Sequence, residues 1–168
     1  MKYVFLVSIL LVTGCQSFGG PKGTPYIGLN EYQSGKGQVY LYRPSGFAMG
    51  MAIPSLEING QSAMSVRNGS YTIYELDPGV HKFVLSRNGN WSAPKMEFTT
   101  DVKVGERHFY RLSTDVGSIY VIGSVGVSTI NGYLGKVNED LAIHEMRRLL
   151  YTGSWSQIPL KTEINDFE

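Results

Sequence analysis

The chain has 168 residues, of which 42% are hydrophobic and 17% are charged. This length and composition suit one globular domain and exclude two domains of ordinary size. The formal net charge of +1 excludes a long-range field that would gather nucleic acid or another strongly charged partner.

The N-terminus predicts a signal peptide over residues 1–14. Lys2 precedes an uncharged, mostly apolar run over residues 3–14. As a helix this run reaches roughly 18 Å, against about 30 Å for the hydrocarbon core of a bilayer. A short apolar run behind one positive charge is typical of a signal peptide rather than of a membrane span.

Cys15 is the only cysteine, and it follows this run directly. The motif Val12-Thr13-Gly14-Cys15 resembles the bacterial lipobox, in which an apolar residue and two small residues precede the cysteine that receives lipid. The resemblance implies that the Cys15 thiol takes a diacylglyceryl group and that its amine is acylated, which attaches the chain to a lipid bilayer because several acyl chains bind far more firmly than one. The alternative is an ordinary secreted protein with an incidental cysteine.

Residues 15–36 are predicted to be the lipidated cysteine and a flexible tether, because Gly and Pro recur there without periodicity. Gln16 follows the cysteine. In bacterial lipoproteins an aspartate at that place favours retention in the inner membrane. Its absence favours the outer membrane, with the domain facing the periplasm.

Residues 37–127 predict a domain of short strands separated by turns. Strands are expected over residues 38–44, 55–66, 71–76, 80–86, 95–104, 108–114 and 118–125, rich in β-branched and aromatic residues. Asn59-Gly60 predicts a hairpin because both central residues of a type I′ turn need positive φ. Asn68-Gly69 and Pro78-Gly79 predict further turns. Regular spacing of short strands favours an antiparallel β-sandwich or barrel.

Residues 128–168 are predicted to hold a Gly-rich loop, one α-helix and a tail. Residues 116–135 carry no charge and include five glycines. They favour a last strand followed by a Gly/Ser loop that could serve as a partner surface. The alternative is a membrane-inserted segment, which the polar serines, threonine and asparagine disfavour. Asn138 predicts the helix N-cap, with Leu141, Ile143 and Leu149 facing a sheet and Gly153 as a stop.

Four short motifs resemble the bacterial family known as domain of unknown function 2846. They are Tyr42-Arg43-Pro44 at the end of a strand, Asn59-Gly60 in a hairpin, Gly69-Ser70-Tyr71 at the start of a strand, and Pro78-Gly79-Val80-His81. The resemblance covers approximately residues 37–122. It implies a signal or lipobox N-terminus and a transthyretin-like (prealbumin-like) or carboxypeptidase-regulatory-like sandwich, and it brings no catalytic residues.

Two residues are weak candidates for ligand or partner contacts. The Arg43 guanidinium offers a planar set of donors to a carboxylate or phosphate, and the alternative is an arginine across a sandwich edge. His81 could act as a base, and the alternative is a residue packed on a strand face with Phe83 and Leu85. The nucleophile-elbow, zinc-helix and phosphate-loop patterns fail on spacing. No cofactor and no metal are therefore expected.

The sequence predicts a non-enzymatic lipoprotein whose β-sandwich is a binding or structural module. One alternative is a subunit of an envelope-assembly or secretion machine, which implies an envelope protein partner. A second is a carrier of a small hydrophobic ligand in a cavity lined by Tyr, Phe and Met. A third is a hydrolase, which requires a nucleophile beside a histidine. No nucleic-acid partner is expected.

Overall fold

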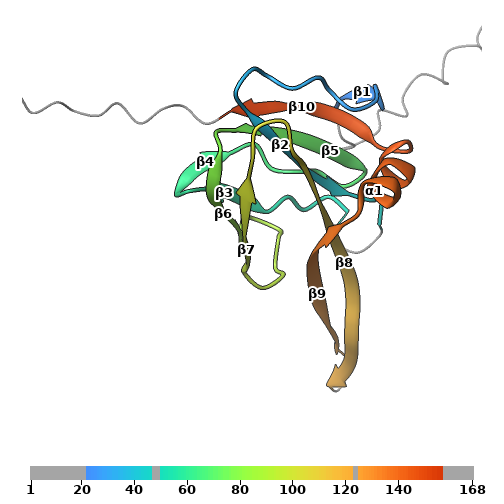
Figure 1. The fold of residues 1–168 in the computed structure, drawn as a ribbon. Helices are drawn as coiled ribbons and strands as arrows, with labels where there is room; N and C mark the ends of the chain where they lie inside the picture. The colour runs from blue at the N-terminus through green and yellow to red at the C-terminus, as the bar shows by residue number, and fades with distance from the viewer. Residues whose placement is uncertain (1–21, 47–49, 123–124, 157–168) are drawn as a thin grey trace, which may run out of the picture.

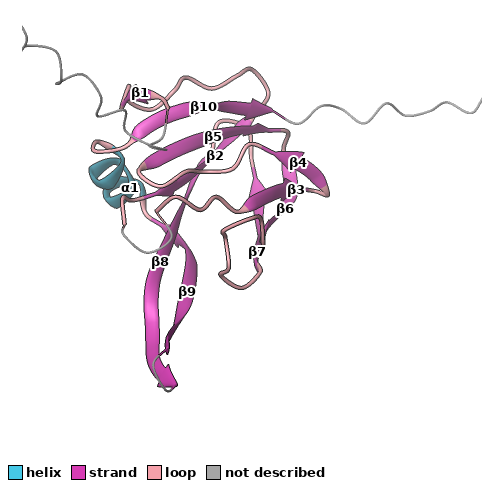
Figure 2. Cartoon of the chain, turned by 180° about the vertical axis from the view of Figure 1, so that it is seen from behind, coloured by secondary structure: helices cyan, strands magenta, loops and turns pink. Residues whose placement is uncertain are grey.

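The structure is a computed structural model, and it describes residues 22–46, 50–122 and 125–156, with residues 118–130 described by their backbone alone. These residues are mainly β, with two sheets and one helix (Figures 1 and 2). The elements are β1 (Thr24–Pro25), β2 (Gly37–Arg43), β3 (Ser55–Ile58), β4 (Gln61–Ala63), β5 (Ser70–Leu76), β6 (Gly79–Ser86), β7 (Met96–Val102), β8 (Arg107–Ile122), β9 (Val125–Val137), α1 (Glu139–Met146) and β10 (Leu150–Ser156). The prediction of a mainly β chain with one C-terminal helix is confirmed.

The two sheets share one hydrophobic core. A six-stranded sheet has the order β1-β10-β5-β2-β8-β9, and a four-stranded sheet has the order β4-β3-β6-β7. Aromatic rings from both sheets meet between them. The Tyr74 ring lies edge-on to Phe83 with centroids 5.6 Å apart, and Phe98 stacks on Tyr110 at 4.0 Å. Such pairs add stability beyond the apolar area that they bury.

The six-stranded sheet is mixed, so the prediction of an antiparallel arrangement is wrong for this sheet. β8 runs parallel to β2, and β10 runs parallel to β5. Parallel neighbours need a long crossover connection. The elements from β3 to β7 lie between β2 and β8 in the chain, and the elements from β6 to α1 lie between β5 and β10.

Both faces of the six-stranded sheet are covered, which explains why every residue of β2 is buried. Val39 and Leu41 point into the core between the sheets, whereas Tyr40 and Tyr42 point to the opposite face. Successive side chains of a strand alternate between faces. We call the face of Tyr40 and Tyr42 the outer face, and it is covered by α1 and by the chain before β2.

The predicted turns are confirmed where local sequence determines them. Asn59 and Gly60 have φ values of 52° and 78° and connect β3 to β4. Gly69 has a φ of 72° just before β5, and Gly79 has a φ of 134° at the start of β6. Positive φ is strained for most side chains and unstrained for glycine, and it is tolerated by asparagine.

The predicted Gly-rich loop after residue 125 is instead the strand β9. It pairs antiparallel with β8 from Phe109↔Val137 to Ile122↔Val125. Neither Gly132 nor Gly135 has a positive φ, so both fit an extended strand. A glycine-rich composition indicates conformational freedom, but the long pairing with β8 fixes the backbone here.

The C-terminal elements also differ from their predicted limits. The helix α1 ends at Met146, and β10 then begins at Leu150, where the sequence predicts the end of the helix and the tail. The helix buries Ala142 and Met146, whereas Leu141 is 44% exposed. The predicted sheet-facing positions are therefore wrong by one residue for Leu141, while Leu149 is buried as expected.

The predicted tether over residues 15–36 is wrong from residue 22 onward. β1 pairs with β10, and Tyr26 and Leu29 pack against the outer face. Thus the chain before β2 is part of the folded domain. The predicted signal peptide, Cys15 and the end of the tail lie outside the described residues.

Candidate functional site

Arg43, the first candidate ligand contact, lies inside the molecule with internal partners. It is 1% exposed at the end of β2. Its Nη1 donates a hydrogen bond of 2.7 Å to the Ala52 carbonyl oxygen, and its guanidinium lies 5.0 Å from the centre of the Trp91 ring. Burial lowers the pKa of Arg43 to about 10. A cation on an aromatic face in this interior supports packing between the sheets.

His81, the second candidate, also has internal partners on both ring nitrogens. Nε2 lies 2.7 Å from the Asp77 carbonyl oxygen, and Nδ1 lies 2.9 Å from the Asn59 side-chain nitrogen. Because a carbonyl oxygen only accepts, Nε2 carries the proton and Nδ1 accepts from the Asn59 amide. The ring joins the β3–β4 turn to the start of β6. Arg43 and His81 belong to different sheets, and the structure does not bring them together.

The described residues contain no group of three or more His, Cys, Asp or Glu side chains placed to hold a metal ion. His108 is 5% exposed on β8, and its Nε2 lies 3.4 Å from Glu106 Oε2. Within the same described residues, no helix is both long and apolar enough to span a membrane.

The outer face carries a buried polar network that the sequence analysis missed. We call residues 26–36 the strap, because they cross this face before β2 begins. Gln38 Nε2 donates to the Glu31 carbonyl oxygen of the strap and to Glu75 Oε1, both at 2.9 Å. Gln38 Oε1 accepts from Tyr40 Oη at 3.2 Å and from Arg107 Nε at 3.1 Å. One glutamine therefore connects the strap to three strands.

Arg107 and Tyr40 hold the strap at a second point. Arg107 Nη2 donates to the Asn30 carbonyl oxygen at 2.7 Å, and the Asn30 backbone N–H donates to Tyr40 Oη at 3.0 Å. The Arg107 guanidinium also lies 4.1 Å from the centre of the Tyr32 ring. Burial raises the pKa of Tyr40 to about 12, so its hydroxyl stays protonated and available as a donor.

Glu75 is the charged member of this network. It is 2% exposed at the last position but one of β5, and its Oε2 is buried without a hydrogen-bond partner in the described part of the chain. Burial raises the pKa of Glu75, and the Gln38 hydrogen bond and the positive charges of Lys36 and Arg107 oppose this shift. An incompletely satisfied buried carboxylate lowers stability at neutral pH.

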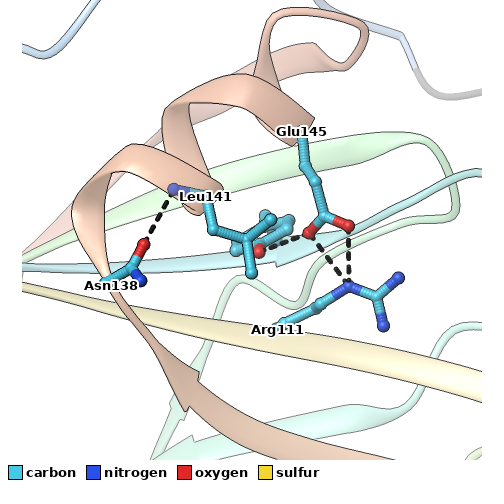
Figure 3. Close-up of polar contacts among 5 residues, drawn as sticks. Arg111, Asn138, Leu141 and Glu145 are labelled. Carbon is cyan, nitrogen blue, oxygen red and sulfur yellow. Dashed lines mark hydrogen bonds and ion pairs between the residues drawn. The ribbon is translucent and has the colours of Figure 1, made fainter.

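A second polar cluster ties α1 to the outer face (Figure 3). Tyr42 Oη donates to Glu145 Oε2 at 2.6 Å, and Arg111 Nε lies 2.9 Å from the same oxygen. Burial and the Glu145 carboxylate raise the pKa of Tyr42. At the start of the helix, Asn138 Oδ1 accepts from the Leu141 backbone N–H at 2.9 Å, as predicted for the N-cap.

The sequence analysis selected none of the residues of these two clusters as candidates for ligand or partner contacts. A signal existed: Gln38 and Glu75 are polar residues in strands that are mostly apolar or aromatic, and such residues need partners when buried. Their partners, however, come from segments far along the chain. Chemically, the clusters join the strap and α1 to the sheet.

The chain belongs to the family described as Protein of unknown function (DUF2846), whose match covers residues 33–126. This confirms the family resemblance of the turn motifs. No curated protein and no solved structure matches the chain significantly.

Proposed function

We propose that this chain is a bacterial lipoprotein, anchored by an acylated Cys15 in the outer membrane and facing the periplasm. Its domain is a binding or structural module without enzymatic activity. The two sheets form a β-sandwich of the transthyretin-like kind, and the expected partner besides the lipid bilayer is a protein of the envelope.

The attachment of the strap to the outer face carries this proposal. A lipidated cysteine fixes the position of a domain relative to the membrane when the chain that follows the cysteine is bound to that domain. β1 begins at Thr24, nine positions after Cys15, and even a fully extended chain spans that separation in at most about 30 Å. The buried contacts of Gln38 and Arg107 with the strap would then transmit the anchor position to the sheet.

The anchor is tested by the variant Cys15→Ser in a bacterial host. We expect the unaltered chain to fractionate with outer membranes and to yield an N-terminal peptide carrying a thioether-linked lipid in mass spectrometry. The Cys15→Ser chain should lose both the fractionation with outer membranes and the lipid on its N-terminal peptide. The matched control Cys15→Ser/Ser17→Cys keeps one cysteine but moves it behind Gln16, and we expect it to lack lipid. A free thiol at Cys15 in the purified wild-type chain would refute the anchor.

A role as an envelope-assembly subunit is favoured over a carrier of a hydrophobic ligand by the packing between the sheets. Phe98 stacks on Phe83 at 4.6 Å and on Tyr110 at 4.0 Å, so aromatic side chains occupy the space that a carrier needs for its ligand. Cross-linking in intact cells, followed by identification of the adduct, tests this role. We expect an adduct with a defined envelope protein. If no other protein is cross-linked to the chain, the subunit role is contradicted.

A further inference from the structure

The far part of the β8–β9 hairpin projects away from both sheets (Figures 1 and 2). We call this part the arm, and it comprises residues 115–122 and 125–131. β2 pairs with β8 only as far as Tyr42↔Arg111, so beyond that point β8 has β9 as its one neighbouring strand. At about 3.3 Å per residue, the arm extends roughly 25 Å as a two-stranded ribbon.

A two-stranded ribbon without a third strand or a helix against it is marginally stable in water. Gly132, one residue beyond the arm on β9, lies close to the Met96 side chain and to Ala93. Among the described strands the arm is therefore two-stranded, and its geometry is one that another strand can complete.

The composition of the arm leaves its edge open to pairing. Asp115 is the one charged residue of the arm, and residues 116–135 contain no charged residue and no proline. Exposed edge strands usually carry lysines, prolines or bulges that prevent association with another strand. Two residues at the ends of this stretch are exposed large side chains, Val116 at 41% and Tyr133 at 56%.

The two edges of the arm differ. The register shifts between Val116↔Ile130 and Ile119↔Ser128, so two residues of β8 oppose one residue of β9. A bulge of this kind bends the strand that contains it and disrupts pairing along its edge. The bulge lies on β8, so β9 is the more regular edge and is the one suited to accept a strand.

We propose that β9 pairs antiparallel with β9 of a second copy of this chain, forming a two-fold symmetric dimer through the uncharged stretch of residues 125–135. Any antiparallel register within this stretch places uncharged residues opposite uncharged residues, so the copies meet without like-charge repulsion. A two-fold pair covers the β9 edge of both copies and closes the assembly. Lipid is a poor alternative occupant, because an open hairpin edge would leave its backbone groups unpaired in hydrocarbon.

Sedimentation velocity of the purified full chain in detergent, over a range of protein concentrations, tests the dimer. We expect a monomer–dimer equilibrium for the wild-type chain. Thr129→Lys places a positive charge on each copy along the shared edge, and it should raise the dimer dissociation constant at least tenfold. The matched control Ser62→Lys adds the same charge to β4, the edge strand of the other sheet, and should leave the constant unchanged.

A charge-reversal experiment separates a lost interface from a misfolded arm. Thr129→Glu alone should also be monomeric, whereas an equimolar mixture with Thr129→Lys should recover a heterodimer. Monomer at all concentrations for the wild-type chain, or an undiminished dimer for Thr129→Lys, would overturn the proposal. Neither outcome bears on the lipid anchor, because the dimer does not depend on Cys15.

Discussion

Glu75 places a buried carboxylate one residue before the end of β5, between Tyr74 and Leu76, which are both fully buried. Its one described hydrogen bond comes from Gln38, and the other carboxylate oxygen has none. The network that holds the strap thus contains a group whose charged form is disfavoured by burial. The free energy that holds the strap on the sheet therefore depends on pH, because burying the charged Glu75 carboxylate is unfavourable.

We expect the free energy of unfolding to depend on pH through Glu75. Burial raises its pKa in the folded state above the ordinary value of 4.5. The contribution of Glu75 to the free energy of unfolding is therefore greatest below pH 4.5, and it is lost as the pH rises through the folded-state pKa. Glu75→Gln removes this titration. The free energy of unfolding, measured by denaturant titration, should therefore fall less between acidic and neutral pH for the variant than for the wild-type chain.

Glu57→Gln is the matched control, because Glu57 is exposed on β3. It should leave the wild-type pH dependence in place. Identical pH profiles for the Glu75→Gln and wild-type chains would show that Glu75 does not ionise with a raised pKa.

The helix α1 is joined to the sheet by one carboxylate. Glu145 accepts hydrogen bonds from Tyr42, whose side chain is buried, and from Arg111. Ala142 and Met146 of the same helix are buried against the outer face. Ala142 and Met146 supply the buried apolar contacts, while Glu145 is the hydrogen-bond acceptor that the described part of the chain offers the Tyr42 hydroxyl.

Glu145→Ala should lower the free energy of unfolding by about 2 kcal/mol, because it leaves a buried hydroxyl unpaired and removes an ion pair. Glu145→Gln keeps an acceptor for Tyr42 and should cost less than half as much. His144→Ala, at an exposed position of the same helix, is the control and should change little. Denaturant titration measures all three, and equal losses for the Ala and Gln variants at Glu145 would argue against this role.

The elements that local sequence determines could be predicted, and those that depend on distant pairing could not. Asn59-Gly60 fixes its own turn through positive φ. By contrast, β10 exists because Tyr151 lies beside Tyr71, and nothing near residue 151 indicates that neighbour. The same holds for the strap, whose Gly/Pro composition indicates a tether until Gln38 and Arg107 provide its partners. In the candidate site, polar residues inside strands were visible, but their pairing was not.

At the scale of the whole molecule, the family match and the folded unit have different limits. The match ends at residue 126, whereas the six-stranded sheet also takes most of β9 and all of β10 from beyond that point. The outer face is covered by residues of α1 and by Leu149, which lie further still. The segment that matches the family and the segment that completes the core therefore have different limits in this chain.

We expect a fragment of residues 33–126 not to fold cooperatively, and a fragment of residues 22–156 to fold. The shorter fragment lacks the Met146 and Leu149 side chains, whose burial contributes roughly 1.5–3 kcal/mol each. It also leaves β5 without β10. These losses are comparable to the 5–15 kcal/mol that stabilises an ordinary domain. Thermal unfolding followed by near-ultraviolet circular dichroism should show a sharp transition for the longer fragment alone. An equally sharp transition at the same temperature for the shorter one would mean that α1 and β10 are appended to a core that is already complete.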